Sequence, residues 1–441
     1  MLKNEPAANV IRFRPEPKII PRSEHNITRA AISENALKVL YRLKNAGYKA
    51  YLVGGGVRDL LLNLKPKDFD VVTDARPEQI RELFRNCHLI GRRFRLAHVR
   101  FGNEIIEVST FRAEHHAGGE GGHSENGRII RDNVYGDIDE DAWRRDFTVN
   151  ALFYNIADFS LVDYVGGLDD IRARQLRLIG NPEERYREDP VRMLRAIRFA
   201  AKLGFSLHPA TEQALRNLDY LLRDVPSARL FEEFMKFFMT GHALESYLQL
   251  RRQDLFVYLC VETSRVLDEE TGGITHNLLV RVFTNTDIRL AAGKTVNPGF
   301  LIAALLWAPL LRMVDDYKSN GLAEMDAITL ASDAVISRQV KSLSMPRRFT
   351  HTAREIWGLQ SRLKHRNGKR PFRLLSHPRF RAGYDFLLLR AEAGENVAAL
   401  AAWWTEFVAA NSSLPEEGGV PATTTGSFPP KRRHRRRSGR H

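Results

Sequence analysis

The sequence predicts an α+β protein in which a small mixed sheet with helices is followed by an all-helical region. Short alternating apolar runs, separated by turn residues, occupy residues 48–110 and are typical of strands. From Pro190 to Trp404 the apolar residues instead recur at helical spacing. The composition changes after Gly166-Gly167, which marks the expected end of the part that contains the sheet.

The first elements follow from local patterns. Residues 1–30 contain four prolines, scattered charges and little periodicity, which predict an irregular basic leader. Residues 32–46 predict an amphipathic helix with capping residues at Ser33-Glu34-Asn35, and residues 48–53 predict a strand. Glycines end this strand and open a short helix over residues 57–62.

The next elements alternate in type. Residues 77–84 predict a helix with proline in its first turn. Residues 96–101 and 104–110 predict a hairpin. The segment 113–128 has five glycines and no apolar periodicity, which favours a mobile loop over a metal site made by its three histidines, His115, His116 and His123.

Composition limits the class of protein. A chain of 441 residues with 43% hydrophobic content is long enough for about three domains. The two cysteines are too few for a disulfide framework, and the N-terminus does not resemble a secretory signal, so we expect a cytoplasmic protein. The apolar stretch 299–311 is too short to span a bilayer and contains Pro309, which predicts a buried helix and no stable membrane insertion.

The charge points to a polyanionic partner, because the formal net charge is +14 at pH 7. The last eleven residues hold seven Lys and Arg residues and no acid, and the remainder of the chain is still basic. Residues 411–441 are expected to form a disordered, Arg-rich tail. The alternative is a solvated end without a role.

Asp68 and Asp70 are the most informative residues of the chain. Residues i and i+2 of a strand project from one face, so both carboxylates can reach the same divalent cations. A third carboxylate, Glu107, lies on the strand-like run 104–109. Oxygen ligands suit Mg²⁺ or Mn²⁺, and two such metals would serve phosphoryl transfer. For Asp-x-Asp in isolation, the alternative is a solvated loop or a helix cap.

A glycine turn precedes the carboxylates. Backbone N–H groups in such a turn can hold phosphates, so Gly54, Gly55 and Gly56 are candidate triphosphate ligands, with Arg58 as a phosphate partner. The turn is neither a P-loop nor a dinucleotide fingerprint. Its closeness to the carboxylate pair is what favours a nucleotide site.

The segment 144–150 adds paired arginines and an aspartate. Asp146 could accept a hydrogen bond from a ribose hydroxyl or join the metal cluster, and Arg145 could contact phosphate. Asn150 closes the same motif. The alternative is an interdomain salt bridge.

The segment 187–200 predicts a basic helix. Asp189 can cap it, and Arg192 and Arg195 lie three residues apart on one face, where they could meet a base edge or an RNA backbone. Taken alone, this is an ordinary capped basic helix.

Four motifs in this order resemble those of class II nucleotidyltransferases, the bacterial poly(A) polymerases and CCA-adding enzymes. They are residues 52–59, 68–70, 144–150 and 188–192. The resemblance implies a polymerase-beta-like nucleotidyltransferase head followed by all-helical neck and body domains. The implied boundaries are residues 31–165 for the head, 166–275 for a nucleotide- and RNA-binding neck, and 276–410 for an RNA-binding body.

The resemblance also implies roles for residues. Asp68, Asp70 and Asp146 match the active-site acids, and Glu107 matches the third carboxylate. Glu188, Asp189 and Arg192 are implied as part of the surface that reads the base. The arginine-rich end is implied to bind RNA through Arg432, Arg433, Arg435, Arg436 and Arg437.

Within this family, residues 91–99, 104–112, 180–189 and 369–378 and the arginine-rich end are similar to the poly(A) polymerase branch. This similarity implies untemplated addition of AMP from ATP to RNA 3′ ends, with pyrophosphate released. It also suggests RNA-decay or RNA-chaperone proteins as partners. Two alternatives stay open: a CCA-adding tRNA nucleotidyltransferase, and a catalytically silent RNA-binding adaptor.

Overall fold

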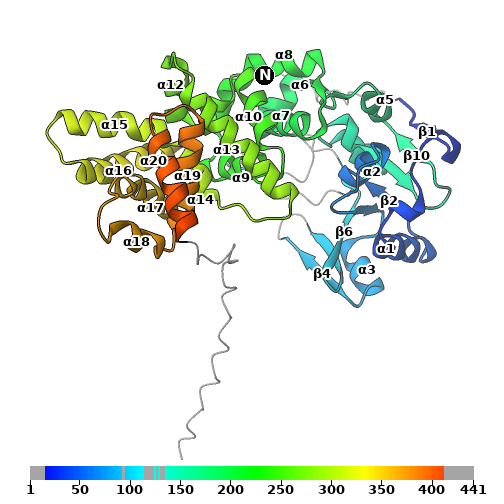
Figure 1. Ribbon diagram of the computed structural model, residues 1–441. Coiled ribbons are helices and arrows are strands. Elements are labelled where there is room, and N and C mark those ends of the chain that lie inside the picture. Colours follow the sequence, from blue (N-terminus) through cyan, green and yellow to red (C-terminus); the bar gives the residue numbers. More distant parts are fainter. Residues whose placement is uncertain (1–14, 92–94, 114–123, 126–127, 130–134, 412–441) are drawn as a thin grey trace, which may run out of the picture. The chain divides into compact units, whose positions relative to one another are not determined.

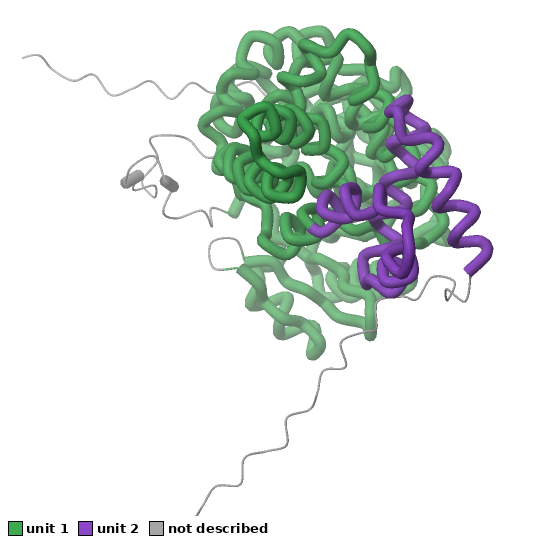
Figure 2. The backbone as a smooth tube through the Cα atoms, turned by 60° about the vertical axis from the view of Figure 1, so that its left-hand side comes forward, with its two compact units in different colours: residues 1–354 green, residues 355–441 purple. Residues whose placement is uncertain are grey.

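Two compact units make up the chain, residues 1–354 and residues 355–441 (Figure 2). The computed structural model describes residues 15–91, 95–113, 124–125, 128–129 and 135–411. The three loop histidines and the five tail arginines named above lie outside these residues. The finer division into head, neck and body stays a prediction.

An eight-stranded mixed sheet organises the N-terminal part of the first unit (Figure 1). Its strand order is β1-β10-β9-β2-β3-β6-β5-β4, and only the pair β3–β6 is parallel. The strands are β1 (Lys18–Ile20), β2 (Ala50–Val53), β3 (Asp70–Thr73), β4 (Cys87–Ile90), β5 (Leu96–Phe101), β6 (Glu104–Thr110), β9 (Leu152–Asn155) and β10 (Leu161–Asp163). A separate two-stranded pair joins β7 (Ser124–Glu125) to β8 (Arg128–Ile129).

The expectation of an irregular leader is wrong for part of residues 1–30. Strand β1 pairs antiparallel with β10 and forms the edge of the sheet. Ile20 and Ile27 are 2% and 1% exposed, so this segment contributes to the core. Hydrophobic burial against residues far along the chain orders it, which a local pattern with several prolines does not reveal.

Helices cover the sheet in an uneven way. Helices α1 (Glu34–Asn45) and α3 (Pro77–Leu83) pack on one face of the sheet. Helix α1 contacts β2, β3 and β6, and α3 contacts β4, β5 and β6. The side chain of Ser33 caps α1 by accepting a hydrogen bond from the backbone N–H of Ala36. On the other face, α4 (Ile138–Trp143) packs with Val53 and Val72 in one apolar cluster.

The expected hairpin and short helix are confirmed. Strands β5 and β6 pair antiparallel across Gly102-Asn103. Helix α2 (Gly55–Leu61) begins directly after β2, at the glycine turn.

The remainder of the first unit is helical, as the apolar spacing predicts, with one small exception. Strand β12 (Ser206–Leu207) pairs in parallel with β11 (Gln175–Leu176). The helices are α5 (Gly167–Arg172), α6 (Pro182–Glu188), α7 (Val191–Leu203), α8 (Pro209–Leu218), α9 (Ser227–Phe238), α10 (Ala243–Arg252), α11 (Phe256–Leu259), α12 (Val261–Glu269), α13 (Ile274–Ala291), α14 (Pro298–Leu305), α15 (Trp307–Ser319) and α16 (Glu324–Ser342).

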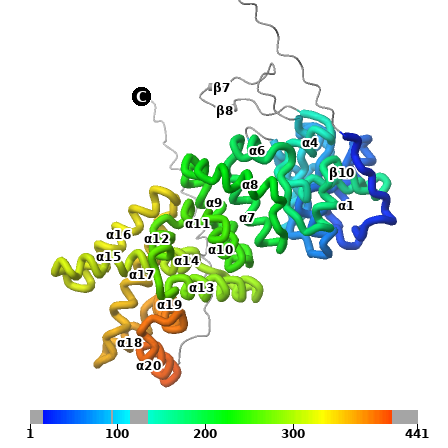
Figure 3. The backbone as a smooth tube through the Cα atoms, turned by 90° about the horizontal axis from the view of Figure 1, so that it is seen from above, coloured from blue at the N-terminus to red at the C-terminus, as the bar shows by residue number. Residues whose placement is uncertain are grey.

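Helix α7 occupies a central place in this unit. Figures 1 and 3 show it between the sheet-containing part and the helices α9 and α10, against which it packs. Residues on α7 can therefore face both the sheet-containing part and the following helices. Gly204 ends α7 in the left-handed conformation, with φ 65°.

The second unit contains the end of α17 (Arg347–Leu363), α18 (Arg370–Leu375), α19 (Phe380–Glu392) and α20 (Ala398–Ala410). Trp404 is completely buried in its core, and its indole N–H donates to the Leu363 carbonyl at 2.9 Å. This tryptophan is thus a core residue of the unit.

Among the described helices, none is by itself long and apolar enough to cross a bilayer. The pair α14–α15, bent by 52° at Leu306, meets the same length and composition test when taken together. The expected burial of the stretch 299–311 is confirmed, because Leu301 to Leu306 are each at most 2% exposed. The expectation of one helix is wrong, because the stretch is divided between α14 and α15.

Candidate active site

Asp70 lies in the sheet between a phosphate-binding candidate and a second carboxylate. It is paired with Val53, the residue before the glycine turn, on one side and with Glu107 on the other. Paired residues of neighbouring strands project from the same face, so Asp70 and Glu107 share a face. Burial, the Glu107 charge and the Asp68 charge raise the pKa of Asp70 to about 6, against the lowering effect of Arg145.

Asp68 lies outside the strand, so the prediction that both aspartates belong to one strand is wrong in this respect. Strand β3 begins at Asp70. The neighbouring strand β2 ends at Val53, and the chain then turns away at Gly54, which leaves Asp68 without a backbone partner in β2. Asp68 is exposed but close enough to raise the pKa of Asp70.

The glycine turn brings backbone against the acidic residues. Gly54 has φ 75° and ψ −142°, a conformation that favours glycine. A Cβ atom on Gly54 would lie 3.6 Å from Oδ2 of Asp70 and 3.8 Å from Nη1 of Arg145. One on Gly56 would lie 3.3 Å from the Asp68 carbonyl oxygen, whereas Gly55 faces the guanidinium of Arg58. The turn, the carboxylates and Arg145 therefore adjoin one another.

Arg58 lies in the protein interior and not at the open site. It is 2% exposed, and its Nε and Nη2 donate to Oδ1 of Asp59 at 2.8 and 2.6 Å. Its Nη1 donates to Oδ1 of Asn150 at 2.6 Å, and Nδ2 of Asn150 donates to Oδ1 of Asp146 at 3.3 Å. In this arrangement Arg58 orients Asn150, which in turn holds Asp146.

Asp141, which no sequence motif singled out, anchors the paired arginines. Its side chain is fully buried and accepts hydrogen bonds from Nε of Arg144 at 3.0 Å and from Nε and Nη2 of Arg145 at 3.0 and 2.8 Å. Burial alone would raise the pKa of Asp141, but the charges of Arg145 and Arg144 outweigh it and lower that pKa. The available signal was the spacing of three and four residues on a helix, which lets one acid meet both arginines.

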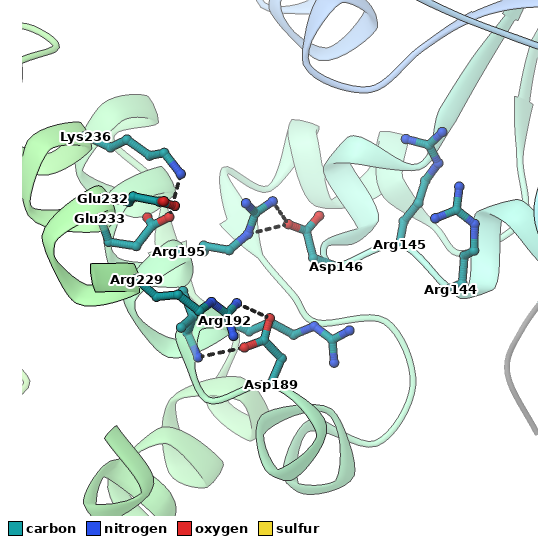
Figure 4. Close-up of a pocket in the computed structure, with 11 residues that line it drawn as sticks. Arg144, Arg145, Asp146, Asp189, Arg192, Arg195, Arg229, Glu232, Glu233 and Lys236 are labelled. Carbon is teal, nitrogen blue, oxygen red and sulfur yellow. Dashed lines mark hydrogen bonds and ion pairs between the residues drawn. The ribbon is translucent and has the colours of Figure 1, made fainter. Parts of the chain in front are cut away.

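A polar cavity of about 400 Å³ opens beside these arginines (Figure 4). Six of its eleven lining residues are basic and four are acidic, and Val191 is the apolar one. The charged residues are Arg144, Arg145, Asp146, Asp189, Arg192, Arg195, Arg229, Glu232, Glu233 and Lys236. Arg145 thus borders both the cavity and the Asp70 cluster, which makes it the link between the two groups.

Asp146 and Arg195 form an ion pair in the lining of this cavity. Nε of Arg195 donates to Oδ2 of Asp146 at 3.1 Å, with a further bond from Nη2, while the backbone N–H of Phe147 donates to Oδ1 at 2.8 Å. Burial would raise the pKa of Asp146, but the Arg195 charge and these hydrogen bonds lower it. Asp146 is therefore held ionised at the cavity wall.

The three residues implied to read the base lie together at the junction of α6 and α7. Nη1 of Arg192 donates to Oε2 of Glu188 at 2.7 Å and to the Arg185 carbonyl at 2.8 Å. Asp189 accepts a hydrogen bond from Nη2 of Arg229 on α9 at 3.1 Å (Figure 4). The sequence motifs indicated Asp189 and Arg192 as site residues but not Arg229, because the ion pair between Arg229 and Asp189 joins residues forty positions apart.

A second buried acid supports α7 from α9. Glu233 is 3% exposed, accepts from Nε of Arg198 at 3.1 Å and pairs with Lys236 at 2.8 Å. Arg58, Arg195 and Arg198 also lie over the ring of Phe199, at 5.4, 5.7 and 4.6 Å. Glu233 was likewise absent from the sequence prediction.

The donor set suits a divalent cation, although it is not a preassembled metal cage. Within the described ranges, no group of three or more His, Cys, Asp and Glu side chains is arranged to hold a metal ion. Burial is the largest cause of the raised pKa of Asp70, and repulsion from the Glu107 and Asp68 carboxylates adds to it, against the lowering effect of Arg145. A hard cation would offset this repulsion, and carboxylate oxygens are its preferred ligands.

Comparison with known families gives three matches along the chain. A model described as "Poly A polymerase head domain" matches residues 50–177. Models described as "Probable RNA and SrmB- binding site of polymerase A" and "Polymerase A arginine-rich C-terminus" match residues 204–267 and 320–439.

Curated relatives agree with these models. Poly(A) polymerase I of Salmonella typhimurium is 52% identical over 95% of this chain and 91% of its own length, and that of Haemophilus influenzae is 46% identical over 92% and 91%. The CCA-adding enzyme of Lactobacillus helveticus is 38% identical over only 48% of this chain and 51% of its own length. The polymerase branch therefore fits far more of the chain.

Solved structures support the α+β fold. The Thermotoga maritima CCA-adding enzyme, in complex with tRNA, has a TM-score of 0.59 at 19% identity and covers 91% of this chain and 88% of its own. The Bacillus stearothermophilus CCA-adding enzyme, in complex with CTP, has a TM-score of 0.56 at 23% identity, with coverage of 87% and 83%. The fold and the curated relatives together confirm the family expected from the motifs: the chain belongs to the bacterial poly(A) polymerases of the nucleotidyltransferase family.

Proposed function

We propose that the chain adds AMP from ATP to RNA 3′ ends without a template. The observation that carries this function is the order of groups across the sheet: the glycine turn, then Asp70, then Glu107. This order suits a triphosphate at the turn and a nucleophile on the far side of Asp70. The 3′ oxygen bonds to the α-phosphorus while the bond to the bridging oxygen breaks; pyrophosphate leaves with that electron pair, and the hydroxyl proton passes to solvent.

Arg145 and the glycine turn are proposed to hold the triphosphate. A guanidinium fixed by a buried carboxylate is preorganised, so little side-chain entropy is lost when it binds phosphate oxygens. The anchor of Arg145 is Asp141. The N–H groups at Gly54, Gly55 and Gly56 supply the remaining donors.

Asp146 and the helix α7 are proposed to hold the nucleoside part of ATP. The ionised Asp146 is an acceptor for a ribose hydroxyl, and Arg195 and Asn150 fix its position. Glu188, Asp189 and Arg192 form the proposed base-reading surface. Hydrogen-bonding groups of this kind discriminate strongly between bases, since a wrong base leaves buried polar groups without partners.

Mg²⁺ or Mn²⁺ is the proposed cofactor, held by Asp68 and Asp70 with Glu107 as the third carboxylate. Bound there, divalent cations would neutralise phosphate charge and lower the pKa of the attacking hydroxyl. The chain's own residues position the two reactants on either side of Asp70.

The other proposed features concern the surroundings of the site. We propose the division into head (31–165), neck (166–275), body (276–410) and tail (411–441), with the tail arginines as a general RNA-binding segment whose affinity falls with salt.

A cytoplasmic location is supported by two free, buried cysteines. RNA-decay or RNA-chaperone proteins are proposed as partners, with promotion of RNA decay as the outcome.

Extension of a 5′-labelled RNA with Mg²⁺ and each nucleoside triphosphate separately tests this function. A long ladder with ATP alone, absent from Asp68→Ala and Asp70→Ala proteins, supports it. Addition confined to tRNA ends and requiring CTP would support a CCA-adding enzyme. Failure to extend either RNA would support the adaptor.

A further inference from the structure

We propose that the open face of strands β6, β5 and β4 binds the last nucleotides of the RNA 3′ end, with His98, His88 and Arg100 as contact residues. The inference deepens the proposed function, on which it rests, by locating the second substrate. It concerns single-stranded RNA, the polyanion whose 3′ hydroxyl has to reach Asp70.

A row of four titratable side chains crosses this part of the sheet. Asp70 pairs with Glu107, Glu107 with His98, and His98 with His88, on the adjacent strands β3, β6, β5 and β4. Directly paired residues project from one face, so all four lie on the same side of the sheet. Nε2 of His98 is 3.4 Å from Oε1 of Glu107. The row leads from the carboxylates to the edge strand.

Among the residues that the structure describes, this face is exposed along β6, β5 and β4, while the opposite face is packed. Along β6 and β5 the side chains alternate, so that Ile106 and Val99 are fully buried, whereas Ile105 is 39% exposed and Arg100 is exposed. Helix α3 packs on the buried side of β4, β5 and β6. On the edge strand, Ile90 is 47% exposed. A ligand could therefore lie across three strands beside the catalytic acids.

The direction of the reaction selects the ligand for this face. In an in-line displacement the attacking and leaving oxygens are on opposite sides of the phosphorus. The glycine turn and Arg145 adjoin Asp70 from the β2 side, where the leaving pyrophosphate is placed. The attacking 3′ hydroxyl then comes from the Glu107 side, where β6, β5 and β4 offer an exposed face to the RNA that carries it.

The side chains on the face match a nucleic-acid strand. Its acids, Asp70 and Glu107, are at the inner end where the hydroxyl reacts, and the outer positions hold His98, His88 and Arg100. Imidazole rings can stack on unpaired bases, and a guanidinium can pair with phosphate. The acids are thus confined to the inner end of the face, and its outer part carries two imidazoles and the Arg100 guanidinium, the groups that could contact bases and phosphate.

Kinetics of two single variants separate RNA binding from ATP binding. His88→Ala, which removes a stacking contact, and Arg100→Ala, which removes a phosphate contact, each should raise the KM for a short oligoadenylate by about fivefold, with the KM for ATP unchanged. Arg100→Ala should also lower the slope of log Kd against log salt by about 0.7. The matched control is Arg81→Ala, an exposed arginine on α3, which packs on the opposite face.

Photocrosslinking of the unmutated full chain gives an independent readout. An oligoadenylate with 4-thiouridine near its 3′ end should crosslink to the peptides of β4 and β5, and excess unlabelled RNA should remove the crosslink. Crosslinks confined to other elements would overturn the inference, as would an RNA KM in both variants equal to that of the Arg81→Ala control. If the wild-type protein adds no AMP, the proposed function fails, while the crosslink still decides where RNA binds.

Discussion

Arg195 on α7 donates its guanidinium N–H groups to the carboxylate of Asp146, at 3.1 Å from Nε to Oδ2. The pair joins the segment that follows α4 to a helix that starts 45 residues later. Through Asn150, the same carboxylate is connected to the buried Arg58. The cavity wall is thus fixed by a chain of hydrogen bonds that joins the sheet-containing part to α7.

Breaking this ion pair should destabilise the protein. Arg195→Ala should cost about 2 kcal/mol, less than for a fully buried pair because Arg195 retains solvent access. Urea unfolding of the wild type, Arg195→Ala, Asp146→Asn and the double variant completes a double-mutant cycle. The double variant should lose less unfolding free energy than the two single variants lose in sum. Additive losses would mean that the two residues do not interact.

The Asp146 contribution should depend on pH in a defined direction. Its pKa is lowered in the folded chain, so its stabilising effect is present above the unfolded value and is lost as pH falls through the folded one. The stability difference between wild type and Asp146→Asn should therefore be constant near neutral pH and shrink in acid. A difference that grew in acid would contradict this assignment.

Asp141→Asn should impair ATP use although Asp141 touches no substrate. Without the carboxylate, Arg144 and Arg145 lose their common anchor, and a misplacement on the order of 1 Å can cost about a hundredfold in rate. We expect kcat/KM for ATP to fall by at least tenfold. Asp139→Asn on the same helix is the control and should have little effect. Unchanged kinetics in Asp141→Asn would show that Arg145 needs no anchor.

Asp70→Asn should stabilise the metal-free protein while abolishing activity. Because the pKa of Asp70 is raised to about 6, its protonated form favours folding, and this contribution is lost as pH rises from the unfolded value of 3.8 through 6. At pH 8 in chelator, the variant should gain about 1–2 kcal/mol, and this gain should become small near pH 4 and vanish below it. Differential scanning calorimetry at pH 8 and near pH 4 measures the stability difference between the variant and the wild type. Glu82→Gln, a change at an exposed residue of α3, is the surface control.

The effect of Mg²⁺ gives the complementary test of Asp70. Addition of Mg²⁺ should raise the melting temperature of the wild type more than that of Asp70→Asn, because a ligand that binds the folded state stabilises it. Equal stabilisation of both proteins would indicate that the cation binds elsewhere.

Local patterns were sufficient for much of the fold. The β5–β6 hairpin, α1 and the Asp70 and Glu107 strands follow from alternation and capping over a few residues. Strand β1 did not, because its three residues are ordered by pairing with β10, more than 140 positions away. Interactions of that separation leave no local signal.

The site was predictable as a set of residues but not as a set of contacts. The order of the motifs predicted Asp70, Asp146 and Arg192 as site residues. It did not predict Asp141 and Glu233, the buried acids that hold the neighbouring arginines. A charged residue in a helix is usually on the solvent side, and only tertiary packing shows that it is buried with partners. For the same reason the sequence could not indicate that the Arg58 guanidinium is buried.

Arg192→Ala should relax the preference for ATP. Loss of its hydrogen bonds at the proposed base-reading surface should reduce the ratio of kcat/KM for ATP to that for CTP by about tenfold or more. Arg187→Ala, which removes an exposed arginine paired with Glu183 on α6, is the matched control. An equal loss with every nucleotide would place Arg192 outside base recognition.

The composition of tails made in one mixed reaction shows whether the chain is an ATP-selective polymerase that needs no template. The substrates are an unstructured RNA and a tRNA that lacks its CCA end, supplied together with all four nucleoside triphosphates at equal concentration and Mg²⁺. Sequencing of the products should show long adenosine tails on the unstructured RNA. Addition limited to CCA on the tRNA, or tails of mixed nucleotides, would show that the chain is not a template-independent, ATP-selective polymerase.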